Sequence, residues 1–118
     1  MLVDAPCSGL GTLRRRADAR WRIDANAVAR LAALQRAIVD AEVELLAPRA
    51  WLVYSVCTMT AAETLDVDDH LASAHPELVA LEAPPPGDAW RPWGRGWIVL
   101  PHDAGTDGMF VLRLQAHE

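Results

Sequence analysis

Two cysteines occur in two short strings of similar chemistry. Cys7 lies in Asp-Ala-Pro-Cys-Ser-Gly over residues 4–9, and Cys57 lies in Tyr-Ser-Val-Cys-Thr over residues 54–58. Each string follows an apolar run, so we expect each thiol where a strand ends and a helix is about to begin, the place where parallel α/β folds put ligands and catalysis. The positive end of a helix dipole lowers the pKa of a nearby thiol, which predicts two reactive thiols. The alternative for either cysteine alone is a small core residue, since free cysteine is among the most buried residue types.

The hydrophobic pattern predicts four strands and two main helices around these strings. We expect strands at residues 1–5, 51–56, 97–100 and 109–114, with the last two joined as a hairpin by the turn at residues 105–108. The first helix should run from Asp24, a natural N-cap, to about Leu46. Its apolar stripe is formed by Val28, Leu31, Leu34, Ile38, Ala41 and Leu45.

The rest of the chain contains one further helix and one long loop. Thr60 and Glu63 have the spacing of a capping box, which predicts a helix over residues 61–73. Residues 83–96 are rich in proline and glycine, which predicts an irregular surface loop. No internal repeat or linker divides the chain.

All eleven basic residues are arginines. Five of them gather around Trp21: Arg14, Arg15, Arg16, Arg20 and Arg22. Because the guanidinium group pairs bidentately with phosphate and stacks on bases, this segment is a predicted contact with an RNA backbone. The formal net charge of −5 argues against a surface that binds nucleic acid over its whole extent. The alternative to an RNA contact for this segment is a solvated arginine-rich loop.

Composition indicates one small domain. The chain has 118 residues, of which 52% are hydrophobic, enough for one core, and no apolar run is long enough to cross a bilayer. No signal peptide is apparent, so we expect a cytoplasmic protein with reduced thiols. We expect no metal site, because His70, His75 and His102 have no metal-ligand spacing relative to the cysteines.

The cysteine strings are accompanied by three further motifs: Leu-Gly-Thr-Leu-Arg-Arg at residues 10–15, Arg-Trp-Arg at 20–22 and Gly-Thr-Asp-Gly-Met-Phe at 105–110. Together they resemble the catalytic region of the Sun/Nop-type RNA cytosine-C5 methyltransferases, from one end of the chain to the other. The resemblance implies an α/β fold, namely the C-terminal half of a Rossmann-like class I methyltransferase sheet with an antiparallel last strand. The family commonly has Thr where Val56 stands, and Glu63 is what remains of a Glu-Asn-Glu string.

The resemblance implies methylation of carbon 5 of cytosine in rRNA or tRNA with S-adenosylmethionine. Carbon 5 is a poor nucleophile, so a thiolate first adds to carbon 6, and by resemblance Cys57 is that nucleophile. Cys7 would help to release the product. Asp4 would contact ring nitrogen 3 of cytosine and would form a small part of the cofactor site. The alternative is a structural carboxylate that caps the following turn. The implied substrate-binding residues are Pro6, Ser8, Gly9, Arg14, Arg15, Arg16, Arg20 and Arg22.

Enzymes of this class hold S-adenosylmethionine with a glycine-rich turn and an acidic residue that both precede the Asp-Ala-Pro-Cys string. We therefore expect residues 1–118 to form a single partial catalytic domain that lacks the cofactor-binding half and is inactive alone. An exposed edge on the first strand should favour self-association or pairing with a partner. Two other functions remain open: a non-catalytic remnant that binds RNA or protein, and a different thiol enzyme with a base such as His102 beside Cys57.

Overall fold

The computed structural model describes residues 1–21 and 23–117. Its strands are β1 (Leu2–Asp4), β2 (Trp51–Val56), β3 (Leu78–Ala80), β4 (Arg91–Trp93), β5 (Gly96–Val99) and β6 (Met109–Ala116). Its helices are α1 (Ala25–Glu44), α2 (Leu65–Ala74) and the short α3 (Pro101–Ala104), together with the 3-10 turns η1 (Leu10–Thr12) and η2 (Ala17–Trp21). None of the described helices is both long and apolar enough to cross a membrane.

The strands form one mixed sheet in the order β1-β2-β6-β5-β4, with β3 also paired to β6. β1 runs parallel to β2, and Asp4 lies opposite Ser55 at the ends of the two strands. β6 is antiparallel to both β2 and β5, which confirms the α/β fold with an antiparallel last strand. Because β1 and β2 are parallel, the loops that follow them leave the sheet at the same edge.

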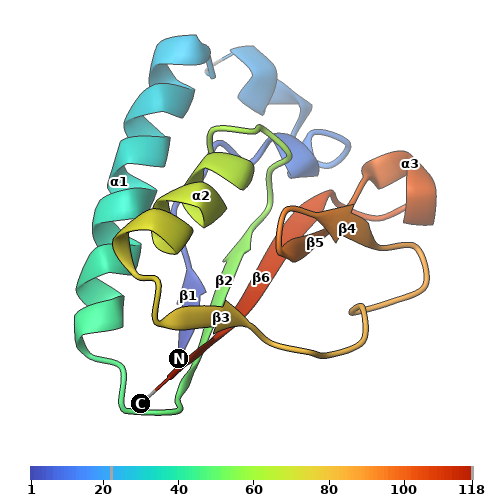
Figure 1. Cartoon of the computed structure of the whole chain (residues 1–118). Helices are drawn as coiled ribbons and strands as arrows, with labels where there is room; N and C mark the ends of the chain where they lie inside the picture. The colour runs from blue at the N-terminus through green and yellow to red at the C-terminus, as the bar shows by residue number, and fades with distance from the viewer. Residues whose placement is uncertain (22, 118) are drawn as a thin grey trace.

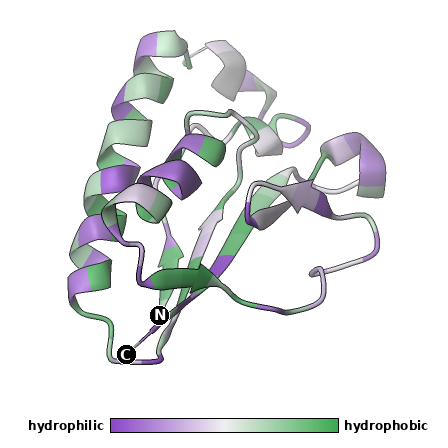
Figure 2. Ribbon diagram, in the orientation of Figure 1, coloured by the Kyte–Doolittle hydropathy of each residue, from purple (hydrophilic) through white to green (hydrophobic). Residues whose placement is uncertain are grey.

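The core lies between one face of the sheet and the pair α1 and α2, which lie side by side (Figure 1). Leu52 and Tyr54 of β2 are fully buried against this layer, and Val39 of α1 and Leu71 of α2 pack onto them. On the other face of β2, Trp51 remains 54% exposed. Figure 2 shows hydrophobic residues on β3 and along much of β6, and an alternation of hydrophobic and hydrophilic residues along α1.

Two predicted elements are confirmed closely. β2 covers residues 51–56 as expected. α1 begins after Asp24, whose side chain accepts a hydrogen bond of 2.8 Å from the backbone N–H of Ala27. This bond satisfies one of the backbone donors that a helix N-terminus leaves unpaired.

The predicted apolar stripe of α1 is confirmed at Ile38, which packs against the core, but the centre of the buried face lies one residue further along the helix. The buried residues of α1 are Ala32, Gln35 and Val39, whereas Leu34 is 46% exposed and Leu45 is 73% exposed. The helix is rotated so that the polar side chain of Gln35 reaches buried partners, and an apolar count does not register such a position.

Three other expectations need correction. The sheet has six strands rather than four, because β3 was missed and β4 forms inside the predicted loop at residues 83–96. α2 begins at Leu65, four residues after the expected start. The predicted β5–β6 hairpin does not close with the tight turn alone, since α3 lies between the strands and ends at Gly105. The pairing of β5 with β6 is nevertheless antiparallel, as predicted.

Candidate active site

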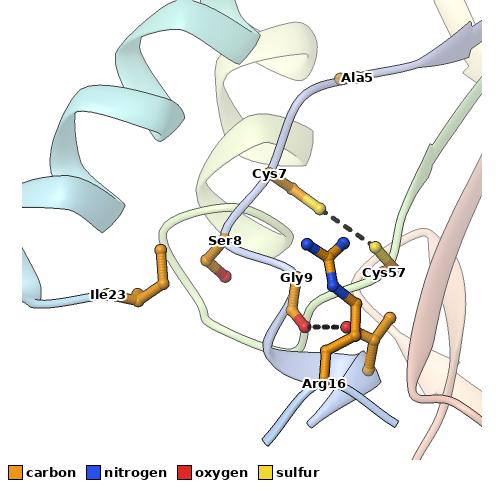
Figure 3. A pocket seen from close by; sticks show the side chains of 8 residues that line it. Ala5, Cys7, Ser8, Gly9, Arg16, Ile23 and Cys57 are labelled. Carbon is orange, nitrogen blue, oxygen red and sulfur yellow. Dashed lines mark hydrogen bonds between the residues drawn. The ribbon is translucent and has the colours of Figure 1, made fainter. Parts of the chain in front are cut away.

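The loops that follow β1 and β2 enclose a cavity of about 360 Å³. The residues that line it are Ala5, Cys7, Ser8, Gly9, Thr12, Arg16, Ile23 and Cys57 (Figure 3). Seven of these eight residues lie between β1 and α1, in or after the loop that carries Cys7 (the first cysteine loop). Cys57 comes from the loop after β2 (the second cysteine loop). The parallel pairing of β1 and β2 therefore brings the two cysteine strings, fifty residues apart in the sequence, into one site.

The two thiols lie in contact at the wall of this cavity. The Sγ atoms of Cys7 and Cys57 lie 3.5 Å apart, and both residues are partly buried free cysteines. Burial, together with the hydrogen bond to Cys57, raises the pKa of the Cys7 thiol to about 12. The expected lowering of the Cys7 pKa by a helix dipole is therefore wrong: burial raises the pKa, and only a single 3-10 turn follows Cys7. Cys7 remains a protonated thiol beside Cys57.

A fully buried carboxylate, that of Glu63, connects the two cysteine loops from behind. From the first loop it accepts hydrogen bonds of 2.7 Å from both the backbone N–H and the hydroxyl of Ser8. From the second loop it accepts a bond of 2.8 Å from Thr58 and one of 2.7 Å from Thr60. Gln35 of α1 adds a bond of 3.2 Å. Burial raises the pKa of Glu63, but the hydrogen bonds from Thr60, Ser8 and Thr58 outweigh that effect and lower it.

Glycines allow three loops to meet at the end of the site. Gly9 has a φ of 71°, in the left-handed region where residues with a Cβ are strained. Gly11 donates a 2.9 Å backbone hydrogen bond to the carbonyl of Cys57 and accepts one of 2.7 Å from Gly108. A Cβ at Gly11 would clash with the carbonyl oxygen of Gly108. The turn at residues 105–108 is thereby held against both cysteine loops.

The predicted arginine segment divides in two. Arg15 forms a bidentate pair with Asp107, with its Nη2 2.6 Å from Oδ2, and Arg14 donates to the carbonyl of Gly105. Hydrogen bonds from Arg15 lower the pKa of Asp107. Arg16 instead lines the cavity, and Figure 3 shows its side chain beside the two cysteines. Arg22 and the side chain of Arg20 lie outside the described residues.

The remaining predicted site residues lie at the margin. Asp4 is exposed at the end of β1 and, like Pro6, is not in the lining of the cavity. Pro6 accepts a hydrogen bond of 2.9 Å from Gln35. Ser8 lines the cavity, but its backbone N–H and hydroxyl are directed to Glu63. His102, the base that a different thiol enzyme would need, is not in the lining and lies beside its neighbour Asp103.

Sequence reasoning missed the polar network around Glu63. Gln35 could have been noticed as a lone amide among the apolar positions of a helix, and Thr58 as a hydroxyl next to the expected nucleophile. Among the described residues, no group of three His, Cys, Asp or Glu side chains is arranged to hold a metal ion.

The mixed sheet, with its antiparallel last strand, has the fold of a Rossmann-like methyltransferase domain. A model of the family described as 16S rRNA methyltransferase RsmB/F matches residues 1–115, and the chain belongs to this family. This finding confirms the resemblance to Sun-type methyltransferases.

Individual relatives agree with the family. The chain is 41% identical over 118 residues to Rv1407 of Mycobacterium tuberculosis, which is named as a methyltransferase. The match covers 98% of this chain and 26% of that protein. It is 38% identical over 120 residues to the probable ribosomal RNA small subunit methyltransferase B of Bacillus subtilis, over 98% of this chain and 27% of that protein. The chain thus spans about a quarter of the length of the curated relatives it matches.

Solved structures show the same fold. The crystal structure of PH0851 matches with a TM-score of 0.88 at 26% identity, over 96% of this chain and 25% of that one. NSun6 from Pyrococcus horikoshii, solved with SFG, matches with a TM-score of 0.80 at 24% identity, over 99% of this chain and 29% of that one.

Proposed function

We propose that this chain carries the cytosine-binding and nucleophile-bearing part of an S-adenosylmethionine-dependent RNA methyltransferase that acts on carbon 5 of cytosine. The observation that supports this most is the pair of thiols, 3.5 Å apart, in one cavity at the ends of two parallel strands. The relatives are named for the small-subunit ribosomal RNA, so ribosomal RNA is the substrate we propose.

In this proposal Cys57 is the nucleophile. Its thiolate forms a bond to carbon 6 of the cytosine, and the electron pair of the 5,6 double bond moves into the ring, which makes carbon 5 enamine-like. Negative charge then builds at ring nitrogen 3 and the carbonyl oxygen. Asp4, at the exposed end of β1, would contact nitrogen 3, where a hydrogen bond or a proton stabilises that charge.

Cys7 acts at the other end of the reaction. Because the pKa of Cys7 is raised to about 12, its S–H persists at neutral pH and can donate to the sulfur of Cys57. After methyl transfer, a base takes the proton from carbon 5, the electrons of that C–H bond re-form the 5,6 double bond, and the electron pair of the bond between carbon 6 and Cys57 leaves with the sulfur. A hydrogen bond from Cys7 stabilises the departing thiolate, which fits a role in product release.

Arg16 is the cationic residue that we place nearest to the substrate, because it lines the cavity with the thiols. A guanidinium there suits the phosphate of the target nucleotide. Arg14 and Arg15 hold the turn at residues 105–108 and contribute from the periphery.

S-adenosylmethionine is the methyl donor expected from the family. The described residues do not fit it by themselves: the cavity lining contains thiols, hydroxyls and one arginine, but no carboxylate that could hold a ribose. Only the chemistry at the cytosine is therefore assigned to this chain.

A chimera tests the proposal. This chain replaces the matching segment of Rv1407, and the product is incubated with labelled ribosomal RNA and S-adenosylmethionine. The Cys7→Ala variant should accumulate a covalent protein–RNA adduct on a denaturing gel, because release is impaired. The Cys57→Ala variant should form no adduct and transfer no methyl group.

The unsubstituted chimera should produce 5-methylcytosine, detected by mass spectrometry of nucleosides. An adduct that survives in Cys57→Ala would reverse or remove the assignment of the nucleophile. RNA binding without any adduct or methylation in all variants would instead favour a non-catalytic remnant.

A further inference from the structure

Glu63 lies outside the cavity and does not touch the space in which a substrate would bind, yet it is fully buried and ionised. Among the described residues, the groups that donate hydrogen bonds to its carboxylate are neutral, with no arginine among them. A buried carboxylate without a cationic partner is costly unless hydrogen bonds compensate it fully. Such an arrangement calls for an explanation other than stability alone.

The position of the donors supplies that explanation. Ser8 immediately follows Cys7 in the chain, and Thr58 immediately follows Cys57. The hydroxyls of both residues bond to the same oxygen, Oε2 of Glu63, at 2.7 and 2.8 Å. They also lie 2.8 Å from each other. One carboxylate oxygen therefore joins the two residues that are covalently next to the two thiols.

Further bonds fix the carboxylate itself. Thr60 bonds to the same Oε2, and the hydroxyl of Tyr54 in β2 donates a 2.9 Å bond to the backbone carbonyl of Glu63. Gln35 of α1 bridges the network to the carbonyl of Pro6, which precedes Cys7 by one residue. The glutamate is thus held by the sheet and by α1, and has little freedom to follow either loop.

We propose that Glu63 is a positioning residue that clamps the Cys7 loop to the Cys57 loop and so sets the distance between the two sulfurs. Its meaning for catalysis rests on the function proposed above, since nucleophile and release thiol must act on the same carbon–sulfur bond. The clamp itself is a property of the geometry and can be tested without RNA.

Disulfide formation reports the distance directly. Diamide, an azodicarboxamide oxidant, takes two electrons and two protons from Cys7 and Cys57, so that an S–S bond forms and its N=N bond is reduced to a hydrazine. The reaction is followed on the dilute 118-residue chain by mass spectrometry and by loss of free thiol. The wild type should close the disulfide rapidly, because its thiols are held together as an effectively intramolecular pair.

The Glu63→Gln variant keeps the side-chain shape but presents an amide NH₂ to a set of donors. We expect it to close the disulfide about tenfold more slowly, because one of the two acceptor oxygens that the loops share is replaced by a donor. Glu82→Gln, at an exposed glutamate, is the matched control and should react at the wild-type rate. Val67→Ala removes buried atoms from α2 without touching the network, and should lower the melting temperature but leave the rate unchanged.

Two results would overturn the clamp. One is a wild-type rate in Glu63→Gln, and the other is an equal slowing in Val67→Ala, which would trace the effect to general stability. Adduct formation in the chimera is scored separately. A slow disulfide in Glu63→Gln with no RNA adduct in any form would retain the clamp and reject the proposed function. An RNA adduct in the chimera, together with an unchanged disulfide rate in Glu63→Gln, would reject the clamp and retain the proposed function.

Discussion

Two carboxylates hold the segment at residues 7–16 at its two ends, and they do so by different physics. Glu63 is fully buried and accepts from neutral donors at Ser8 on the inner end. Asp107 is 24% exposed and pairs with the guanidinium of Arg15 on the outer end. Hydrogen bonds lower the pKa of both carboxyls. The inner end is held by an interaction shielded from water and salt, and the outer end by one that a competing anion can displace.

For the function proposed above, this contrast suits a site that keeps two thiols at a fixed distance while RNA binds. Around the thiols the separation has to be fixed, and the buried network does that. Around Arg15 a phosphate can compete with Asp107 for the same fork of donors. We infer that the outer end can exchange partners without disturbing the inner one.

The strongest test of the contrast removes the buried carboxylate entirely. Glu63→Leu leaves the N–H of Ser8 and the hydroxyls of Thr58 and Thr60 without their acceptor, and should cost about 3–5 kcal/mol of unfolding free energy. Urea unfolding followed by circular dichroism measures it. Glu82→Leu should stay within about 0.5 kcal/mol of the wild type. A loss of stability in Glu63→Leu no larger than in this control would mean that the network contributes nothing.

The same glutamate explains where sequence reasoning succeeded and failed. β2 was predictable because its apolar run has clear ends, and the start of α1 because the cap of Asp24 is local. The Thr60 and Glu63 spacing also produced real contacts, since the hydroxyl of Thr60 bonds to the Glu63 carboxylate. The helix nevertheless starts at Leu65, and the same carboxylate also accepts a hydrogen bond from Ser8, 55 residues away.

Other errors have the same origin in distant partners. β4 was read as loop because proline and glycine dominate its surroundings, yet Arg91 pairs with Ile98 of β5. The pKa of Cys7 is raised rather than lowered, because the fold buries its thiol and places it in a hydrogen bond with Cys57, which is also far away in the sequence. The cysteine strings indicated that each thiol follows a strand, which the structure shows for β1 and β2, whereas the residues that hold the two strings together were visible only in three dimensions.

Acid should reveal the buried carboxylate through its pKa. The pKa of Glu63 is lower in the folded chain than its ordinary value of about 4.3, so its stabilising effect is present above that pH and is lost as the pH falls through the folded pKa. Between pH 7 and pH 3 the wild type should therefore lose stability more steeply than Glu63→Gln. Two other carboxyls keep some acid sensitivity in both the wild type and Glu63→Gln. Burial raises the pKa of Asp40, but hydrogen bonds from His75 and His70 outweigh that effect and lower it, and the pKa of Asp107 is also lowered.

Urea unfolding at several pH values measures the two slopes. Parallel curves for the wild type and Glu63→Gln would show that folding leaves the pKa of Glu63 unchanged, because only a pKa that differs between the folded and unfolded states makes stability depend on pH. The contrast with Asp107 would then rest on burial alone and not on a pKa shift.

The outer pair should respond to salt rather than to packing. Asp107→Asn removes the charge that faces Arg15. We expect its melting temperature to fall much less than that of Glu63→Leu. The difference from the wild type should shrink as salt is raised, since the Debye length falls from about 10 Å at 0.1 M to about 3 Å at 1 M. Thermal unfolding at the two salt concentrations provides the measurement. A salt-independent difference would place Asp107 in the same class as Glu63.

The smallest expected effect separates two neighbouring arginines in RNA binding. Arg16 lines the cavity, whereas Arg15 already has Asp107 as its counter-ion. Arg16→Gln should therefore reduce the dependence of log affinity on log salt by roughly 0.7 for single-stranded RNA, the value of one lost phosphate contact. Arg15→Gln should reduce it less, because a phosphate gains only what Asp107 gives up. Fluorescence anisotropy of a labelled oligonucleotide at several salt concentrations measures both slopes. Equal reductions would show that Asp107 does not withhold Arg15 from RNA, and no reduction in either would assign the arginines to solvent.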